Sequence, residues 1–461
     1  MNPAYDTTGI LIDFPQSLTE TVTVTEPPAP PAAAAPPEAE ASALRQAPPS
    51  LWRDRNFAAF WSAQSISQFG VQIGHLAMPV LAVVILGASE FQVGVLNASA
   101  TAAFLLIGLP AGAWVDRWLK RQVMITADLV RAAAMLSVPL LWWMDLLHMW
   151  HLYAVAGVLG IATVFFDVAY QSYVPVLVRN DQVPDANSKL ESTAQLARMG
   201  GPAAGGALLQ VIAAPLLFLA DTVGYLFSAL FLARTRDREA RAPRHDRRPL
   251  AVEIKEGLGF VVRHPLISRI AACTGLTNFF AGLAATLFPL LVLRELGLGA
   301  GALGLVYSVA AAGGLLGAVA APRLAKLTGE GALIPLASLA SAVFLMAMPL
   351  SVLMPDEAWA LILLVVGEAG LSFCSLVYNV MQVTMRQRVC PPRLLGRMNA
   401  SIRFLVYGVL PLSGLLAGVL GHAIGLVPTL WIGVAGTLLA AVPVLFSPLW
   451  TLRRLPDSYE G

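Results

Sequence analysis

The sequence predicts an all-α membrane protein with twelve transmembrane helices in two six-helix bundles. Composition is the first observation behind this prediction, because 57% of the residues are hydrophobic, 13% are charged and the mean hydropathy is +0.69. Soluble domains carry about 25% charged residues, so these values exclude a soluble globular protein. The other two observations are the length of the apolar runs and the one-sided placement of basic residues between them.

The apolar runs have the length that a membrane-spanning helix requires. An α-helix rises about 1.5 Å per residue, so roughly 20 apolar residues cross a hydrocarbon core about 30 Å thick. An even number of spans also places both ends of the chain on one side of the membrane. The twelve predicted spans cover residues 57–86, 91–115, 122–144, 150–178, 188–212, 215–233, 266–293, 301–325, 331–354, 358–385, 395–421 and 426–450.

Basic residues determine the predicted orientation of these spans. Lys and Arg precede span 1 and follow spans 2, 4, 6, 8, 10 and 12, whereas the connections on the other side hold only Arg294. Cytoplasmic connections of membrane proteins are enriched in Lys and Arg, so both ends of the chain are predicted to lie in the cytoplasm. A nucleic-acid-binding surface is the competing interpretation of this much arginine, and the hydropathy excludes it.

The tails and the central connection complete the predicted organisation. Residues 1–50 are rich in Pro, Ala and Glu, which predicts a disordered cytoplasmic tail, with PxxP docking as the alternative. The central connection places four apolar residues, the first Leu250 and the last Val261, on one face, which predicts an amphipathic helix on the membrane surface. The predicted parts are a tail (1–50), a first bundle (51–233), a basic linker (234–265), a second bundle (266–452) and a cytoplasmic tail (453–461).

Span 2 ends in the segment GAWVDRWLKR, residues 112–121. It resembles the loop 2–3 signature of the major facilitator superfamily, in which a Gly is followed by Asp-Arg and a basic pair. The resemblance implies the major facilitator fold and a cytoplasmic latch that is made in one conformation and broken in the other. An ordinary loop with orienting charges is the alternative. The predicted latch residues are Gly112, Asp116, Arg117, Lys120, Arg121, Asp128 and Asp167, the last two on adjacent spans.

Span 5 contains the segment ARMGGPAAGG, residues 197–206. It is similar to the Gly-Pro-x-x-Gly-Gly signature of superfamily exporters that work as antiporters, although Ala197 stands where many relatives have a Gly. Small residues allow close packing, and Pro removes a backbone donor and bends the helix. A kinked packing helix with no link to export is the alternative. The predicted residues of this exporter segment are Arg198, Gly201, Pro202, Gly205 and Gly206.

The likeness covers residues 51–450 and is strongest to the twelve-helix branch that includes the enterobactin exporter and macrolide efflux proteins. It is carried further by FFDVAYQSYVPVLV in span 4 and KEGLGFVVRHP in the linker. The resemblance implies a monomer in the bacterial plasma membrane whose partners are small-molecule cargo, protons and the lipid bilayer, and not nucleic acid. No cofactor or metal is expected, because the chain lacks a GxxxxGK[ST] motif and any His, Cys and Asp cluster with metal-ligand spacing.

Ionisable residues within the spans are functional candidates, because a charge in the middle of a transmembrane helix costs about 3 kcal/mol or more. Glu368 lies near the middle of span 10 and is the preferred proton-coupling candidate. Many relatives carry an acid directly after the glycine of span 1, whereas this chain has Val71. Asp221 and His75 are the other candidates. For each of the three, pairing or packing against a neighbouring helix is the structural alternative.

Polar side chains on several spans predict a central cavity. Three glutamines recur every four residues along span 1, which suggests a stripe that faces water. With abundant Phe, Trp and Met, the cavity is expected to be broad and mostly apolar and to suit an amphipathic cargo. Arg198 and Arg403 are candidate counter-ions for Glu368 or for an anionic group of the cargo. The predicted polar cavity residues are Gln64, Gln68, Gln72, Asn278, Asn379 and Arg403.

The sequence therefore predicts a secondary transporter that exports a drug or a siderophore-like metabolite by alternating access, coupled to protons. An enzyme is not expected, since no nucleophile–base or metal arrangement is present. Two alternatives stay open. The same fold working in the other direction would be a proton-coupled uptake symporter, and a non-transporting membrane sensor or scaffold would use residues 1–50 to recruit a partner.

Overall fold

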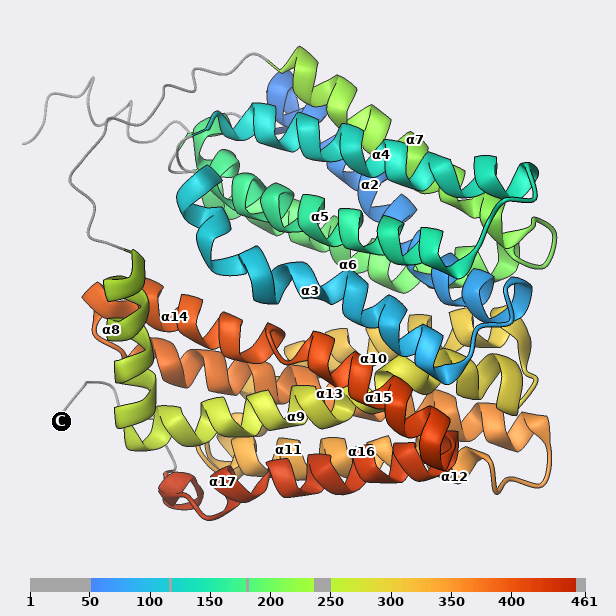
Figure 1. Ribbon diagram of the computed structural model, residues 1–461. Coiled ribbons are helices and arrows are strands. Elements are labelled where there is room, and N and C mark those ends of the chain that lie inside the picture. Colours follow the sequence, from blue (N-terminus) through green and yellow to red (C-terminus); the bar gives the residue numbers. More distant parts are fainter. Residues whose placement is uncertain (1–50, 116–117, 180–181, 236–249, 453–461) are drawn as a thin grey trace, which may run out of the picture. The chain divides into compact units, whose positions relative to one another are not determined.

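The computed structural model describes residues 51–115, 118–179, 182–235 and 250–452, and this part of the chain contains helices and no β-strand (Figure 1). The predicted tails, 1–50 and 453–461, lie outside the described residues. Within the described part, eleven helices are long and apolar enough to cross a membrane. The chain is therefore an all-helical, multi-pass membrane protein.

The first bundle begins with a capped helix. A short 3-10 helix, η1 (Leu51–Arg53), precedes Asp54, whose carboxylate accepts hydrogen bonds from the backbone N–H groups of Asn56 and Phe57 at 2.8 and 3.2 Å. This satisfies two of the N–H groups that a helix start leaves free. The bundle consists of α2 (Arg55–Val80) with the π-helical turn η2 (Leu81–Ile85), α3 (Glu90–Val115), α4 (Lys120–Trp143), α5 (Met149–Leu177), α6 (Val183–Leu208) and α7 (Ala214–Arg234).

The second bundle contains three spans that are each divided into two helices. A proline follows each division within three residues, at Pro349, Pro411 and Pro443, and its missing N–H removes a hydrogen bond there. The bundle consists of α9 (Pro265–Leu290) with the π-helical turn η4 (Leu291–Glu295), α10 (Gly299–Thr328), α11 (Leu333–Leu345) with α12 (Ala347–Ser351), α13 (Glu357–Val389), α14 (Pro392–Tyr407) with α15 (Leu410–Ile424), and α16 (Leu426–Ala440) with α17 (Val442–Leu445) and η5 (Pro448–Thr451).

α6 departs from the predicted pattern. It has 26 residues, enough to cross a bilayer, but it is missing from the eleven apolar helices. Lys189 and Glu191 in its first half and Arg198 in its second half lower its hydropathy. The helix packs against α2 of the first bundle and α10 of the second, so each bundle covers part of its surface. α6 is the twelfth helix of membrane-spanning length, and it runs from residue 183 to 208 instead of the predicted 188–212.

The first helices of the two bundles end in the same way. Pro79 lies two residues before the π-helical turn η2, and Pro289 lies two residues before η4. Two residues after these turns come Gly87 and Gly297, whose φ angles are 63° and 65°. Glycine adopts positive φ without a steric penalty. The shared sequence of kink, π turn and glycine indicates that the two halves are structural repeats.

The predicted amphipathic helix of the linker is α8 (Leu250–Arg263), which lies across the ends of α9 and α14 (Figure 1). Glu256 forms an ion pair with Arg397 of α14. A Cβ added at Gly257 would lie 2.6 Å from the carbonyl oxygen of Arg397, so the two helices are in backbone contact. Val261 is buried in the hydrophobic cluster of the second bundle. These contacts attach α8 to the second bundle.

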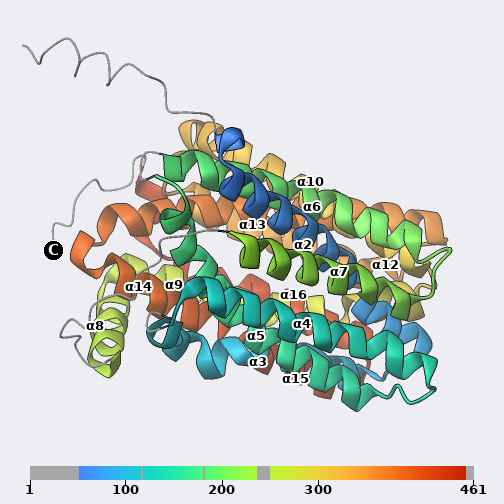
Figure 2. The same cartoon turned by 90° about the horizontal axis from the view of Figure 1, so that it is seen from above.

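Two helix pairs join the bundles, α3 with α15 and α6 with α10, and Figure 2 shows the members of each pair side by side. A Cβ added at Gly94 of α3 would lie 2.6 Å from the carbonyl oxygen of Gly414. A Cβ added at Gly206 of α6 would lie 3.1 Å from the carbonyl oxygen of Ala300. Small residues allow this backbone approach, so glycines set the contacts between the bundles.

The hydrophobic core differs between the two ends of the bundles. At the end opposite the Arg-rich connections, one cluster contains residues of both bundles, such as Leu81 and Leu291. At the end with the Arg-rich connections, called the basic end below, the first bundle has its own cluster around Phe57. The second bundle has another cluster there, around Ile267. Among the described residues, the bundles therefore share a buried hydrophobic cluster at the end opposite the basic end, and each has its own cluster at the basic end.

We predict that the start of α9 loosens in acid. The Nδ1 atom of His264 accepts hydrogen bonds from the N–H groups of Leu266 and Ile267, both at 3.3 Å, and only a neutral imidazole can accept them. Burial lowers the pKa of His264, whereas an unfolded histidine titrates near about 6.5. The cap therefore stabilises the helix above about pH 6.5 and is lost as the pH falls.

Amide hydrogen exchange at Leu266 and Ile267, corrected for the intrinsic rate, should rise as the pH falls below about 6.5. His264→Asn is the matched control, because an asparagine oxygen caps a helix without titrating. Equal pH dependence in the wild type and this variant would contradict the assignment.

Candidate transport cavity

Two neighbouring chambers, together called the cavity below, lie toward the basic end. The chambers share Gln171 of α5. The first chamber, about 330 Å³, is lined by α2, α5 and α6 of the first bundle. The second chamber, about 550 Å³, is lined mainly by α9, α11, α13 and α14 of the second bundle. Both volumes lie in the range of small-molecule sites, about 300–1,000 Å³.

The second chamber is lined by hydroxyl, amide and guanidinium groups. The hydroxyl groups of Tyr378 and Thr274 are hydrogen-bonded at 2.8 Å, and the amide of Gln382 donates to Asn379 Oδ1 at 2.8 Å. Arg386 is buried, and its Nε has no hydrogen-bond partner within the described structure. Two arginines and no carboxylate belong to the lining. The other polar lining residues are Gln171, Thr277, Asn278, Ser338, Ser341, Ser375, Arg403 and Tyr407.

The first chamber carries charges of both signs. Arg198 and Glu191 of α6 form an ion pair at 3.7 Å, and both side chains are more than half exposed. Asp167 of α5 also lines this chamber and lies within electrostatic range of Arg131 in the first bundle and of Arg403 in the second. The carboxylate of Asp167 therefore interacts electrostatically with one guanidinium of each bundle.

The structure divides the predicted polar residues between the chambers. Gln72 lines neither chamber. It packs against Gly201 of α6, where an added Cβ would overlap the side chain of Gln72. Gln64 lines the first chamber and also donates to Ser228 Oγ at 3.4 Å. The first chamber holds Gln64, Gln68 and Arg198, and the second holds Asn278, Asn379 and Arg403.

The three proton-coupling candidates lie outside both chambers. Glu368 is half-buried on α13, where it lies within electrostatic range of Tyr307 of α10. His75 is exposed at the surface of α2. Asp221 of α7 is buried against Gly74 of α2, and neither of its carboxylate oxygens has a hydrogen-bond partner in the described part of the chain.

The predicted latch is described only in part, because Asp116 and Arg117 lie outside the described residues and the surroundings of Gly112 are not described. Lys120 begins α4. Arg121 donates to the carbonyl oxygens of Thr235 and Ala233 at 2.9 and 3.3 Å, where it binds the end of α7. The other two latch candidates lie elsewhere, since Asp128 pairs with Arg131 and Asp167 lines the first chamber. The latch stays a prediction.

The exporter segment forms the surface through which α6 contacts both bundles. Gly201 packs against Gln72, and Gly205 packs against Ile73 and Leu76 of α2. On the other side, the carbonyl of Pro202 and the backbone of Gly206 contact Gly304 of α10. Larger residues at these positions would separate the helices, so the small residues are explained by packing. Arg198 is the member of the segment that lines the cavity.

Sequence reasoning missed Arg131, which lies in the middle of α4. Its guanidinium is paired with Asp128, three residues earlier, and lies 4.1 Å from the ring centroid of Phe166 and 4.5 Å from that of Tyr225. The signal was available, because DLVR within an apolar run places an acid and a base one helical turn apart.

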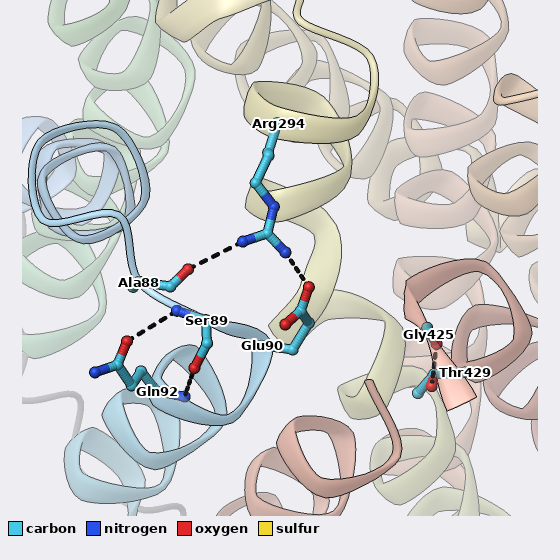
Figure 3. A network of polar contacts seen from close by, with 7 residues as sticks. All are labelled: Ala88, Ser89, Glu90, Gln92, Arg294, Gly425 and Thr429. Carbon is cyan, nitrogen blue, oxygen red and sulfur yellow. Dashed lines mark hydrogen bonds and ion pairs between the residues drawn. The ribbon is translucent and has the colours of Figure 1, made fainter. Parts of the chain in front are cut away.

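The end opposite the basic end is closed by an ion pair between the bundles. Arg294 of η4 pairs with Glu90 of α3, and it also donates to the carbonyl oxygen of Ala88 at 3.2 Å (Figure 3). The start of α3 is ordered by a capping box, in which Ser89 N–H donates to Gln92 Oε1 and Gln92 N–H donates to Ser89 Oγ. This cap positions Glu90 for Arg294.

Comparisons with known proteins agree with this architecture. A family model described as "Transmembrane secretion effector" matches residues 47–456. The chain is 27% identical to the multidrug efflux pump Tap of Mycolicibacterium fortuitum, over 80% of this chain and 89% of that protein. It is 27% identical to the enterobactin exporter EntS of Shigella dysenteriae serotype 1, over 74% of this chain and 80% of that protein. A bacterial homologue of the iron transporter ferroportin, in its inward-facing state, superposes with a TM-score of 0.69 at 17% identity, over 85% of this chain and 98% of that one.

We predict that Glu90→Gln favours opening at the end opposite the basic end. The pair is partly exposed, and such pairs contribute about 1 kcal/mol or less, so the ratio of open to closed molecules should rise by up to about five-fold. Trp150 and Trp359 are exposed and lie at this end in different bundles. Spin labels at these two positions should show a larger population of molecules with a long label-to-label distance. Glu357→Gln, which removes a carboxylate from the first turn of α13, should leave the distribution unchanged. The same shift in both variants would contradict the role of the pair.

Proposed function

Because the chain belongs to the transmembrane secretion effector family of major facilitator transporters, which are not enzymes, we propose that it exports lipophilic or amphipathic small molecules by proton-coupled antiport. The observation that carries this proposal is the two-chambered cavity. It lies between the bundles, has the size of a small-molecule site, and is bounded at one end by a core that both bundles share. A cavity bounded at one end is what alternating access requires.

The basic end faces the cytoplasm in this proposal, which follows the distribution of Lys and Arg. The structure then corresponds to the state that takes up cargo from inside the cell. Cargo enters the two chambers, the bundles rock about the α3–α15 and α6–α10 contacts, and the Glu90–Arg294 pair opens to release cargo outside. A proton that binds from outside drives the return.

The second chamber suggests what the cargo presents to the protein. Arg386 and Arg403 line it without a carboxylate, and Arg386 Nε and Gln382 Oε1 are buried without partners within the described structure. A buried donor without a partner costs about 1–3 kcal/mol, so a carboxylate, phenolate or other acceptor on the cargo would satisfy it. We therefore propose an amphipathic cargo with an acceptor-rich or anionic head. Its apolar part would contact the aliphatic and aromatic side chains of the lining, such as Val406 and Tyr407.

Export is favoured over uptake by two observations. The two relatives reported above are a multidrug efflux pump and an enterobactin exporter. The segment from Gly201 to Gly206, which resembles an exporter signature, forms the contact between α6 and α10.

We expect purified protein in liposomes to move a fluorescent amphipathic dye against its gradient when a pH difference is imposed, and to stop when an ionophore collapses that difference. Removal of residues 1–48 should leave the flux unchanged, because a transporter does not need a recruitment tail. Dye accumulation in the direction of proton flow would indicate a symporter. Flux that persists without the gradient would refute proton coupling.

We also expect anionic amphiphiles to raise the melting temperature of the purified protein more than cationic ones of similar size. Arg386→Gln should weaken their binding about ten-fold, the loss that corresponds to a charge-assisted hydrogen bond of about 1.5 kcal/mol. Arg388→Gln is the matched control, because Arg388 pairs with Glu330 at 3.0 Å and does not line the chamber. Equal loss in both variants would contradict the anionic-head assignment.

A further inference from the structure

We propose that Asp221, Asp128 and Arg131 form a buried site that binds one exchangeable proton, and that Asp167 connects this site to the cavity. The inference rests on the proposed function, which it deepens by assigning residues to the coupling ion. It differs from the prediction drawn from the sequence, in which Glu368 was preferred.

Arg131 is the centre of the cluster. It is 5% exposed and its ion-pair partner Asp128 is fully buried, so the pair lies in the interior of the first bundle. The rings of Phe166 and Tyr225 lie against the guanidinium at 4.1 and 4.5 Å. Aromatic faces attract a guanidinium, and more strongly when water is excluded. Arg131 is therefore held as a cation by one carboxylate and two rings.

Asp221 supplies the site for the proton. It is 1% exposed, and both of its carboxylate oxygens lack a hydrogen-bond partner in the described structure. Gly74 of α2 makes the space, because a Cβ at that position would overlap the carboxylate. An ionised carboxylate without a partner is strongly destabilising inside a membrane protein. Asp221 is therefore the neutral acid in this conformation, with its proton available for release.

The charges around Asp221 are defined by the helices that pack on α7, which are chiefly α2 and α4. α4 contributes Asp128 and Arg131, and α7 itself contributes Tyr225. α2 presents Gly70 and Gly74 to the carboxylate, and it presents no charged side chain there within the described residues. α5, which packs on α4, contributes Asp167 within electrostatic range of Arg131 and Tyr225.

The numbers of acidic and basic groups in the cluster favour a proton over a metal ion as the ligand. Three carboxylates, those of Asp128, Asp167 and Asp221, lie within electrostatic range of one guanidinium. At most one of them is fully compensated by Arg131, so the other two exchange protons or contact water. A metal cation would have to bind beside the fixed charge of Arg131, which repels it. A proton neutralises Asp221 without needing further ligands.

Asp167 links the buried site to the cargo chamber. It lines the first chamber, and it lies within electrostatic range of both Arg131 and Arg403. When the proton leaves Asp221 through Asp167 and chamber water, Asp221 becomes a second carboxylate for Arg131. The second negative charge offsets part of the positive charge of Arg131 that acts on Asp167. The interaction of Asp167 with Arg403 of the other bundle then becomes the stronger of the two. Proton release thereby changes an electrostatic contact across the cavity.

Asp221→Asn tests the proposal with two measurements on the full-length protein in liposomes. The first is transport: dye movement driven by an imposed pH difference should fall by about 5- to 150-fold, the range of a typical coupling free energy. Dye exchange at equal pH, which needs a folded cavity but no coupling, should persist. Glu368→Gln is the matched control and should retain the driven flux.

The second measurement is infrared difference spectroscopy of a pH titration, which detects the carbonyl band of a buried protonated carboxyl group. The wild type should show an exchangeable band that Asp221→Asn removes and Glu368→Gln keeps. Retention of driven flux or of the band in Asp221→Asn would overturn the site. A wild type whose flux ignores the pH difference would refute the proposed antiport, and the infrared band would then decide the proton site by itself.

Discussion

The hydrocarbon core of a bilayer offers no hydrogen bonds, so this chain must satisfy its backbone and its charges from within. In the described part of the chain, eleven apolar spans and α6 satisfy the backbone within helices. Charged groups are satisfied locally, as where Arg131 pairs with Asp128 one turn away and lies between two aromatic rings. Others line the chambers, as Asp167, Arg198 and Arg403 do, whereas Asp221 is buried without a hydrogen-bond partner in the described structure. Burial of charge and access of water therefore determine together where chemistry can occur.

The same constraint explains how the cavity is bounded. Helices of the two bundles approach each other most closely at glycines, which give backbone contact without requiring polar side chains. Toward the end with Leu81 and Leu291 these contacts are continuous with a shared apolar cluster. Toward the basic end each bundle buries its own apolar residues. The polar lining between the bundles is therefore left to face water.

Much of the fold could be predicted from the sequence, because length and hydropathy are properties of each helix alone. Eleven spans are found where apolar runs were predicted, and the amphipathic pattern of the linker identified α8. The divisions before Pro349, Pro411 and Pro443 were missed, because proline is tolerated inside membrane helices. α6 was predicted as a span despite its charges, and its boundaries shifted because its stability comes from α2 and α10.

The site was less predictable, because it depends on how neighbouring helices are rotated and crossed. Gln68 and Gln72 belong to one polar stripe, yet Gln68 lines the first chamber while Gln72 packs on Gly201. The glutamine stripe indicates a face of α2, but it does not say where along that face α6 crosses. Asp221 was identified as an intramembrane acid, whereas its relation to Arg131 required the packing of α4 on α7.

The placement of α6 has a consequence for how the protein enters the membrane. A segment with Lys189, Glu191 and Arg198 is too polar to partition into lipid by itself, and one of the two helices that shield it, α10, is synthesised later. The Gly206 face of α6 stays uncovered until Gly304 arrives. We therefore expect the packing of α6 to be completed only after the second half of the chain has been made.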